Sequence, residues 1–341
     1  MKIVQLVKLY SPHIGGVETH VSSISEVFAA MDHEVTVLTS QLSADQDLTQ
    51  EENGVKIVRR PFSYFEKKFR TWWWILQNWK LFREADVVHV HDVGWWILPV
   101  LPLISKKFYI TFHGWETDWP IPQKSKLLRW ILAKCAKGTI HVGSWIQEFY
   151  WDRPTVITYG GVKLTSEVLS KETPHKKDPL SIIFVGRLSD DTGVYVYLEL
   201  IDLLKESWPG GVEVTWVGDG PLRSLCESTG SVTGMVDFPE KHIPPADLVF
   251  ASSYLSMLLA QALGKIVIST YDSPLKRRYI ETYPGQQTIL HSDNPHQLLQ
   301  RIISLAKDKK QWQEMQKKSK QTAEKMTWIA VADQYARLWE K

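Results

Sequence analysis

The sequence predicts an α/β protein made of two doubly wound, parallel-sheet domains in tandem. Short apolar runs alternate with longer amphipathic runs, as strands and helices do in a parallel sheet that is covered on both faces. The polar, charged and proline-containing stretch KETPHKKD, at residues 171–178, separates two such series and reads as a linker. The length of 341 residues is that of two domains of ordinary size.

The first half begins with a buried strand at Lys2–Leu6 and a helix at Val17–Ala30, whose apolar residues recur at spacings of three and four. Further strands are predicted at Glu34–Leu38, Val55–Val58, Val87–Val90, Phe108–Thr111, Gly138–Val142 and Thr155–Ile157. We assign residues 1–170 to an N-terminal Rossmann-like domain.

The second half repeats the alternation. Strands are predicted at Ser181–Val185, Glu213–Val217, Leu248–Ala251, Ile266–Ser269 and Gln287–Leu290, and helices at Val194–Glu206, Leu222–Glu227, Leu255–Leu263, Leu275–Glu281 and Pro295–Lys307. Residues 309–341 are helical and amphipathic. We assign residues 171–323 to a second Rossmann-like domain.

The composition narrows the class of protein. The net charge of +2 gives no argument for nucleic-acid binding. Cys135 and Cys226 lie far apart and neither belongs to a CxxC pair, so we expect no disulfide framework or zinc site, and a reducing compartment fits. The first apolar stretch is too short for a signal peptide, and the longest, Trp95–Ile104, contains two prolines and too few residues to span a bilayer. We therefore expect a cytoplasmic protein.

Ligands of open α/β sheets bind beyond the carboxyl ends of the strands. Gly15 and Gly16 follow the first strand and precede a helix, where the backbone could approach a phosphate; the other interpretation is a tight turn only. The loop lacks the GxGxxG pattern, which disfavours a dehydrogenase.

His89 and His91 share one face of a strand, but no third metal ligand stands at a recognisable spacing, so we favour a structural or cleft-facing pair and predict no metal.

Other strand ends also carry candidate ligand-binding residues. His113 directly follows a strand and could hydrogen-bond a sugar hydroxyl or transfer a proton. Gly186 and Arg187 follow the first strand of the second half, where the guanidinium could hold a phosphate or form only a surface ion pair. Glycine turns recur at 217–221 and 232–236, and residues 251–256 run from a strand into a helix N-terminus. Together these turns predict a nucleotide pocket.

These motifs, in this order, resemble glycosyltransferase family 4, the retaining sugar transferases of GT-B fold, whose two Rossmann-like domains face a cleft. The similarity extends over nearly the whole chain: GGVETHV, HEVTVLT, VVHVHD, TFHGWE, ITYGGV, FVGRL, WVGDGP, VTGMV and MTWIAVADQYARLWE. The last of these, at 326–340, resembles the closing helix that crosses back onto the first domain, so we expect residues 324–341 to pack there.

The resemblance implies a role for each candidate. Gly15 and Gly16 would line the cleft near the leaving phosphate and sugar, His113 would contact the transferred sugar, and Arg187 would neutralise the diphosphate. The other donor-side candidates are Gly186 and Gly218, Met235 and Val236 beside the base, and Tyr254, Leu255 and Ser256 with backbone N–H groups for the phosphates. The acceptor-side candidates are His13, Glu18, Trp115 and Glu116.

The chain also departs from the family pattern. Thr192 stands where the family has a lysine before Gly193, and Ala251 and Leu259 stand where it has paired glutamates eight residues apart. Gly160 replaces an asparagine. A lost cation can cost on the order of 10²-fold in rate. We therefore expect transfer to continue if another lysine or arginine supplies the charge, and to be lost if none does.

Residues 64–83, YFEKKFRTWWWILQNWKLFR, mix basic and aromatic side chains. On a helix they would form either an interfacial membrane surface or a core-packed helix with a solvated basic face. The first interpretation favours a lipid-linked saccharide or a growing envelope polysaccharide as acceptor, and a location on the inner face of the cell membrane.

We therefore predict a hexosyltransferase-type enzyme. It would move a sugar from a UDP- or GDP-linked donor to a hydroxyl of a glycan or lipid-linked saccharide, with retention and without metal or other cofactor. The main alternative is a catalytically degenerate homologue that acts as a binding or partner protein. A sugar-nucleotide epimerase on the same architecture is a third possibility.

Overall fold

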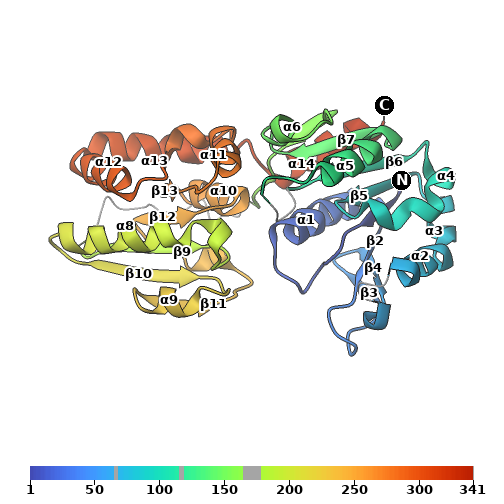
Figure 1. Ribbon diagram of the computed structural model, residues 1–341, viewed down its shortest axis with the longest axis horizontal. Coiled ribbons are helices and arrows are strands. Elements are labelled where there is room, and N and C mark those ends of the chain that lie inside the picture. Colours follow the sequence, from blue (N-terminus) through green and yellow to red (C-terminus); the bar gives the residue numbers. More distant parts are fainter. Residues whose placement is uncertain (65–67, 115–118, 164–177, 341) are drawn as a thin grey trace. The chain divides into compact units, whose positions relative to one another are not determined.

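The computed structural model describes residues 1–64, 68–114, 119–163 and 178–340, and it divides into two compact units (Figure 1). The N-terminal unit comprises Met1–Tyr159 with Trp328–Lys341, and the C-terminal unit comprises Gly160–Thr327. The predicted boundary between residues 170 and 171 lies outside the described residues.

The N-terminal unit contains an eight-stranded sheet in its described part, with strand order β3-β4-β2-β1-β5-β6-β7-β8. The strands are β1 (Lys2–Leu6), β2 (Glu34–Ser40), β3 (Thr49–Glu52), β4 (Val55–Arg60), β5 (Val87–His91), β6 (Phe108–Phe112), β7 (Gly138–Val142) and β8 (Val156–Thr158). All neighbours pair in parallel except β3, which forms an antiparallel hairpin with β4. The predicted strands are confirmed; β3 was missed because its sequence TQEE is polar and lies at the sheet edge.

One face of this sheet is covered by a continuous layer of helices. They are α2 (Lys68–Gln77), α3 (Trp79–Glu84), the 3₁₀ segment η2 (Gly94–Val100), α4 (Leu101–Ile104) and α5 (Gln123–Cys135). Their inward side chains share one apolar core with the strands, including Trp74, Phe82, Ile97, Ile104 and Leu132. Elsewhere in the unit, α1 (Gly16–Ala30) and α14 (Trp328–Trp339) pack against each other, so the end of the chain belongs to the N-terminal unit.

Two helical predictions for this layer need correction. The segment expected to be one helix at 64–83 begins with the 3₁₀ turn η1 (Phe62–Tyr64) and then forms two helices, because Asn78 ends α2 by donating its side-chain amide to the Trp74 carbonyl. Helix α5 was not predicted, because several of its apolar residues face outward and blur the pattern. Among the described residues no helix is long and apolar enough to cross a bilayer.

The C-terminal unit contains a parallel sheet of order β11-β10-β9-β12-β13-β14. Its strands are β9 (Leu180–Val185), β10 (Val212–Val217), β11 (Ser231–Gly234), β12 (Leu248–Ala251), β13 (Ile266–Ser269) and β14 (Ile289–His291). Its helices are α8 (Val194–Ser207), α9 (Arg223–Glu227), α10 (Tyr254–Ala262), α11 (Pro274–Glu281), α12 (Pro295–Lys307) and α13 (Lys309–Ala323). The predicted strand at Gln287–Leu290 begins later, because Gln286–Thr288 forms the 3₁₀ turn η5. Residues 232–234 of the expected glycine turn at 232–236 belong to strand β11.

Both sheets reverse their strand order at a central point. In the N-terminal unit β2 lies on one side of β1 and β5 on the other, and in the C-terminal unit β10 and β12 flank β9 in the same way. Ligands of open α/β sheets bind beyond the carboxyl ends of the strands at such switch points. The loops after β1, β5, β9 and β12 are therefore where a site is expected.

Candidate functional site

The loop after β1 brings two acceptor-side candidates together. The Nδ1 atom of His13 lies 3.3 Å from Oε1 of Glu18. A Cβ atom on Gly15 would lie 2.3 Å from the Glu18 carboxylate, whereas one on Gly16 would meet nothing within 4 Å. Glu18 lies in the first turn of α1, so its carboxylate complements the positive end of the helix dipole. A side chain at position 15 would displace only the flexible end of Glu18, so internal packing requires glycine at neither position.

His113 follows β6 and belongs to a hydrogen-bonded network of imidazoles. Its Nε2 atom lies 2.9 Å from Nδ1 of His91, and His91 Nε2 lies 2.9 Å from the side-chain oxygen of Gln5. The Gln5 amide nitrogen donates to Ser25 at 2.9 Å, so its oxygen is the acceptor for His91. His91 therefore carries its proton on Nε2 and accepts from His113 through Nδ1.

This chain of bonds fixes the tautomer of His113. With its Nε2–H donated to His91, a neutral His113 keeps an unprotonated Nδ1, and no hydrogen bond is formed by that atom in the described part of the chain. Burial, together with the neighbouring His89 and Arg129, lowers the pKa of His113 to about 3. His113 is therefore neutral at pH 7, and its Nδ1 can accept a hydrogen bond from a ligand.

A second arm of the network ties the C-terminal helix to the sheet. The Trp339 indole N–H donates to His89 Nδ1 at 3.0 Å, and His89 Nε2 donates to Thr111 at 2.7 Å. The Tyr335 hydroxyl lies 2.9 Å from both Thr111 Oγ1 and His20 Nε2. Hydrogen bonding and burial give His89 and His91 structural partners, whereas the sequence left open a structural or a cleft-facing pair. No group of three metal-ligating side chains occurs among the described residues.

The loop that carries His113 is held from both sides. Its backbone N–H donates to the Asp92 carboxylate at 3.0 Å, and Arg129 donates to the Gly114 carbonyl at 2.9 Å. Arg129 is itself packed between Phe112 and Tyr150, at 3.9 and 4.0 Å from the ring centroids. Trp115 and Glu116, two of the acceptor-side candidates, lie outside the described residues.

In the C-terminal unit, Arg187 follows β9 with two-thirds of its side chain exposed, and it donates to Asp191 at 2.7 Å. Packing within the domain explains why glycine stands at two of the predicted positions. A Cβ on Gly218 would lie 1.8 Å from the Gly186 carbonyl oxygen, so these two turns can pack together only without side chains. Gly234, with φ of +77°, ends β11, and Met235 and Val236 follow it, with Met235 half exposed.

The N-terminus of α10 offers less than the sequence suggested. The Tyr254 N–H donates to the Tyr279 hydroxyl at 2.7 Å, and the Ser256 N–H donates to Ser253 Oγ at 3.4 Å. Of the three N–H groups proposed for phosphate, only that of Leu255 makes no hydrogen bond among the described residues. Two of the three N–H groups proposed for phosphate are therefore already hydrogen-bonded within the protein.

Comparison with known proteins agrees with this architecture. Residues 14–164 match the profile of Glycosyltransferase Family 4. Sucrose-phosphate synthase from Thermosynechococcus elongatus superposes with a TM-score of 0.79 at 14% identity, over 99% of this chain and 98% of that chain. HepE from Anabaena, in complex with UDP, gives 0.72 at 16% identity over 100% of both chains. A TarM variant from S. aureus, in complex with fondaparinux, α-GlcNAc-glycerol and UDP, gives 0.73 at 12% identity over 100% of both. No curated protein matches the sequence.

The N-terminal part of this chain is therefore similar to glycosyltransferase family 4, and the chain is a divergent glycosyltransferase. The profile match lies in the N-terminal domain, and the structural neighbours show the GT-B fold for the chain as a whole. At the positions of the family's paired glutamates, the glycosyltransferase has a buried Ala251 and a partly buried Leu259. The backbone oxygen of Ala251 accepts from Tyr197 and Ser269, at 3.2 and 2.8 Å, so this strand end is closed by neutral groups.

A cation that sequence reasoning missed lies at the same sheet edge. Lys276, on α11, is buried and donates to the Ser252 carbonyl at 2.6 Å. Ser252 Oγ donates to the Thr192 carbonyl at 2.5 Å, and Thr192 Oγ1 donates to the Arg187 carbonyl at 2.7 Å. Burial lowers the pKa of Lys276 to about 8, with Asp191 and Asp272 raising it and Arg187 lowering it. Lys276 and Arg187 therefore share one electrostatic environment.

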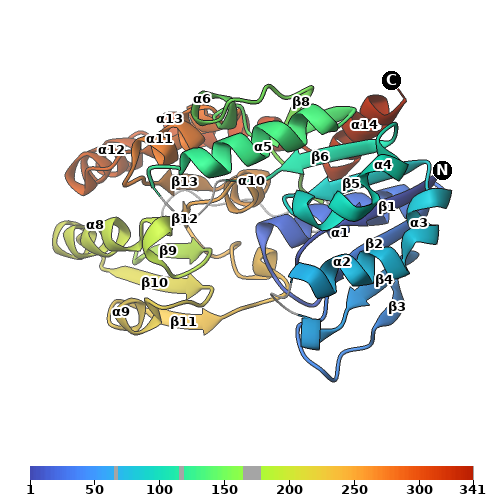
Figure 2. The same ribbon diagram turned by 45° about the vertical axis from the view of Figure 1, so that its right-hand side comes forward.

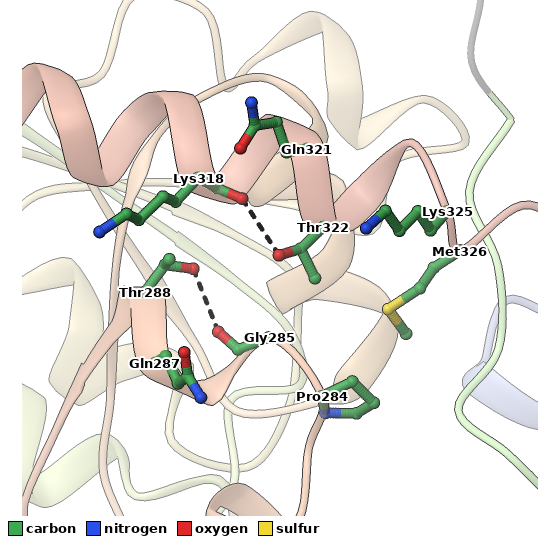
Figure 3. Close-up of a pocket in the computed structure, with 9 residues that line it drawn as sticks. All are labelled: Pro284, Gly285, Gln287, Thr288, Lys318, Gln321, Thr322, Lys325 and Met326. Atoms are coloured by element: carbon green, nitrogen blue, oxygen red, sulfur yellow. Dashed lines mark hydrogen bonds between the residues drawn. The ribbon is translucent and has the colours of Figure 1, made fainter.

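A cavity of the glycosyltransferase lies away from these residues. A cavity of about 380 Å³ is lined by Pro284, Gly285, Gln287, Thr288, Lys318, Gln321, Thr322, Lys325 and Met326 (Figure 3). Four of these residues lie between positions 284 and 288, just before β14, so the cavity lies at the amino end of that strand. It contains no predicted site residue, and donors bind at the other end of such strands. We therefore place the candidate donor site at the carboxyl edge around Arg187.

Proposed function

We propose that this glycosyltransferase moves a sugar from a UDP- or GDP-linked donor to a hydroxyl of a glycan acceptor, with retention and without metal. The observation that carries the proposal is the pair of cations, Arg187 and Lys276, at the carboxyl edge of the C-terminal sheet. Their side chains lie at the switch point where open α/β sheets bind nucleotides.

The two cations would act on the leaving group. As the glycosidic bond to the nucleoside diphosphate breaks, negative charge grows on the diphosphate, and fixed positive charge stabilises it. Arg187 can offer two parallel N–H groups, and a diphosphate would compete with Asp191 for them. Lys276 would supply the second charge that Thr192 does not.

His113 would bind the donor sugar. Because its Nδ1 is an unprotonated acceptor and its pKa is about 3, it suits a hydrogen bond from a sugar hydroxyl better than proton transfer at neutral pH. The neighbours support this substrate class, since HepE is described in complex with UDP and glucose.

The acceptor would be a lipid-linked saccharide or an envelope glycan at the inner face of the membrane. Helix α2 has features of both interpretations from the sequence, since one side packs in the core and the other exposes an apolar surface. Trp74 and Ile75 pack in the core, while Phe69 is 82% and Trp73 59% exposed on the outer side. An apolar outer face with basic flanks is typical of interfacial helices.

The alternative is a binding protein without catalysis. Two observations favour it: no carboxylate stands at Ala251 or Leu259, and the N–H groups of Tyr254 and Ser256 are already bonded inside the protein. The retained cations and His113 oppose it.

Calorimetric titration with UDP, GDP and ADP, without metal, tests the donor site. We expect one of them to bind, and incubation of the matching nucleotide sugars with glycan or lipid acceptors should then give a transferred product with retained anomeric configuration. Binding without turnover would favour the degenerate homologue, and conversion of the donor alone would favour an epimerase. If the folded protein binds none of the three, the donor site is refuted.

A further inference from the structure

His20, on α1, is a buried histidine that lies beside His113. The two rings meet edge to face, with 4.8 Å between their centroids, and only 2% of the surface of His20 is exposed. His20 is four residues after Gly16 on the same helix, so both lie on one face of α1. His20 therefore connects the start of α1 with the loop that carries His113.

One nitrogen of each of these two rings is left for a ligand. Nε2 of His20 is bonded to the Tyr335 hydroxyl, and Nε2 of His113 is bonded within the imidazole network. The Nδ1 atoms of both rings form no hydrogen bond in the described part of the chain. Nδ1 of His141 and Nδ1 of His291 are sealed off from solvent without a partner, whereas the Nδ1 atoms of His20 and His113 are not sealed off. These two nitrogens are thus open to a ligand.

A chain of hydrogen bonds that runs in one direction sets the proton of His20. Trp339 donates to His89 and His89 donates to Thr111, so the hydrogen of the Thr111 hydroxyl needs another acceptor. Among the described residues that acceptor is the Tyr335 hydroxyl at 2.9 Å, which then donates its own hydrogen to His20 Nε2. The reverse direction would leave the buried Thr111 hydroxyl with an unbonded hydrogen, which is unfavourable.

His20 and His113 therefore present opposite hydrogen-bonding groups. Burial and the neighbouring His113 lower the pKa of His20 well below its ordinary value, so His20 is neutral at pH 7. With Nε2 as an acceptor, a neutral His20 keeps its proton on Nδ1 and presents an N–H donor. His113 has the other tautomer and presents an acceptor at Nδ1. The N-terminal domain thus places one donor beside one acceptor.

We propose that His20 is a second sugar-binding residue, and that it forms with His113 a donor–acceptor pair that recognises one hydroxyl of the donor sugar. This inference rests on the proposed function, in which His113 binds that sugar. A hydroxyl group can accept a hydrogen bond from His20 Nδ1 and donate one to His113 Nδ1 at the same time. A sugar that lacks this hydroxyl satisfies neither ring, so the pair determines which sugar is accepted.

The donor character of His20 depends on the C-terminal helix. Helices α1 and α14 come from opposite ends of the chain and lie side by side, in blue and red in Figure 2. The Trp328 ring of α14 meets His20 edge to face, with 5.2 Å between the centroids, and the Tyr335 hydroxyl holds Nε2. Tyr335 is thus a positioning residue, because it acts through His20 and not on the sugar.

Nuclear magnetic resonance of protein labelled at the histidine nitrogens measures both tautomers directly. We expect His20 to carry its proton on Nδ1 and His113 to carry its proton on Nε2. In Tyr335→Phe, His20 should lose its single tautomer while His113 keeps its own. A wild-type His20 with its proton on Nε2 would overturn the donor–acceptor pair.

Deoxy analogues of the donor test the recognition of one hydroxyl. UDP-glucose, UDP-galactose and GDP-mannose are first screened for turnover, and the active donor is then compared with analogues that each lack one hydroxyl. At one position we expect the wild-type kcat/KM to fall about 10²-fold or more, because a site built to bond a hydroxyl rejects the analogue without it.

The matching variant is His20→Gln, whose amide can keep the bond to Tyr335 but cannot supply the Nδ1–H. We expect it to lower kcat/KM for the complete sugar about tenfold, to reduce the discrimination against the deoxy analogue equally, and to leave UDP or GDP affinity unchanged. The control is His33→Gln, since His33 is a partly exposed histidine at the amino end of β2 and should behave like the wild type.

The outcomes separate this inference from the proposed function. If a nucleotide sugar is turned over and His20→Gln keeps both the wild-type kcat/KM and the wild-type discrimination, the pair is overturned and the proposed function stands. If no donor is turned over, the proposed function fails, and the histidine signals are followed with free glucose, galactose and mannose. A shift of both Nδ1 signals then supports the pair, and the absence of a shift overturns it as well.

Discussion

The two candidate sites at strand ends of this glycosyltransferase differ in the charge of their side chains. In the N-terminal domain His113 ends a buried network of neutral, mutually bonded side chains, whereas in the C-terminal domain Arg187 and Lys276 are charged and only partly balanced by Asp191 and Asp272. A neutral hydrogen-bonded network discriminates between ligands by the positions of their hydroxyl groups, whereas a cationic sheet edge discriminates between them by their negative charge. The difference matches a sugar on one side and a diphosphate on the other.

The largest expected effect is at the cationic edge. Arg187→Ala should weaken binding of the nucleoside diphosphate about 10²-fold, as loss of one electrostatic contact at a preorganised site does. Calorimetric titration measures it. Arg277→Ala is the matched control, because Arg277 is also an exposed arginine paired with an acid four residues away, on α11 of the same domain. Equal affinity in wild type and Arg187→Ala would remove Arg187 from the site.

A smaller loss is expected at Lys276. Lys276→Gln should weaken diphosphate binding about tenfold, since one buried hydrogen-bonded charge contributes about 1.4 kcal/mol or more. Lys265→Gln is the control: Lys265 is also buried and donates to backbone carbonyls, of Pro244 and Ala246, but it lies at the amino ends of β12 and β13. Similar losses in both variants would indicate a general effect on stability.

The same lysine predicts a pH dependence. Its pKa of about 8 lies below the ordinary value of 10.5, so the charge is present below pH 8 and is lost as pH rises through 8. Diphosphate affinity should fall between pH 7 and 9 in the wild type and stay flat in Lys276→Gln. The stability contribution has the opposite sign: the unfolded chain keeps this proton up to 10.5, so the destabilising effect of burying the charge disappears as pH rises above 8.

In the neutral network of the N-terminal domain, His113→Ala should lower kcat/KM about tenfold and leave the affinity for UDP or GDP unchanged. The reason is that one hydrogen bond to the sugar is lost while the diphosphate contacts remain. His33→Ala, which removes a partly exposed imidazole at the amino end of β2 in the same domain, is the comparison. A parallel loss of nucleotide affinity in His113→Ala would contradict the division of labour between the two domains.

The sequence predicted the strands well because buried parallel strands are short continuous apolar runs. It could not predict Lys276 as a site residue, because its burial depends on β12 and α11 packing together. The role of Tyr279 in occupying the Tyr254 N–H was equally invisible, since these residues are 25 positions apart. His113 was found by its place after a strand, but its tautomer depends on Gln5 and His91, which only the folded sheet brings into line.

The last prediction compares the glycines of the two sites by the change in the free energy of unfolding when each is replaced by alanine. Gly218→Ala should destabilise the protein by about 2 kcal/mol or more, because the new Cβ would overlap the Gly186 carbonyl and φ is +147°. Gly16→Ala should change the free energy of unfolding by less than about 0.5 kcal/mol, since its Cβ meets nothing within 4 Å at the first turn of α1. Denaturant titration measures both. If Gly16→Ala keeps its stability yet loses transfer activity, Gly16 is a glycine that a ligand requires; if activity is also unchanged, the loop after β1 is a turn only.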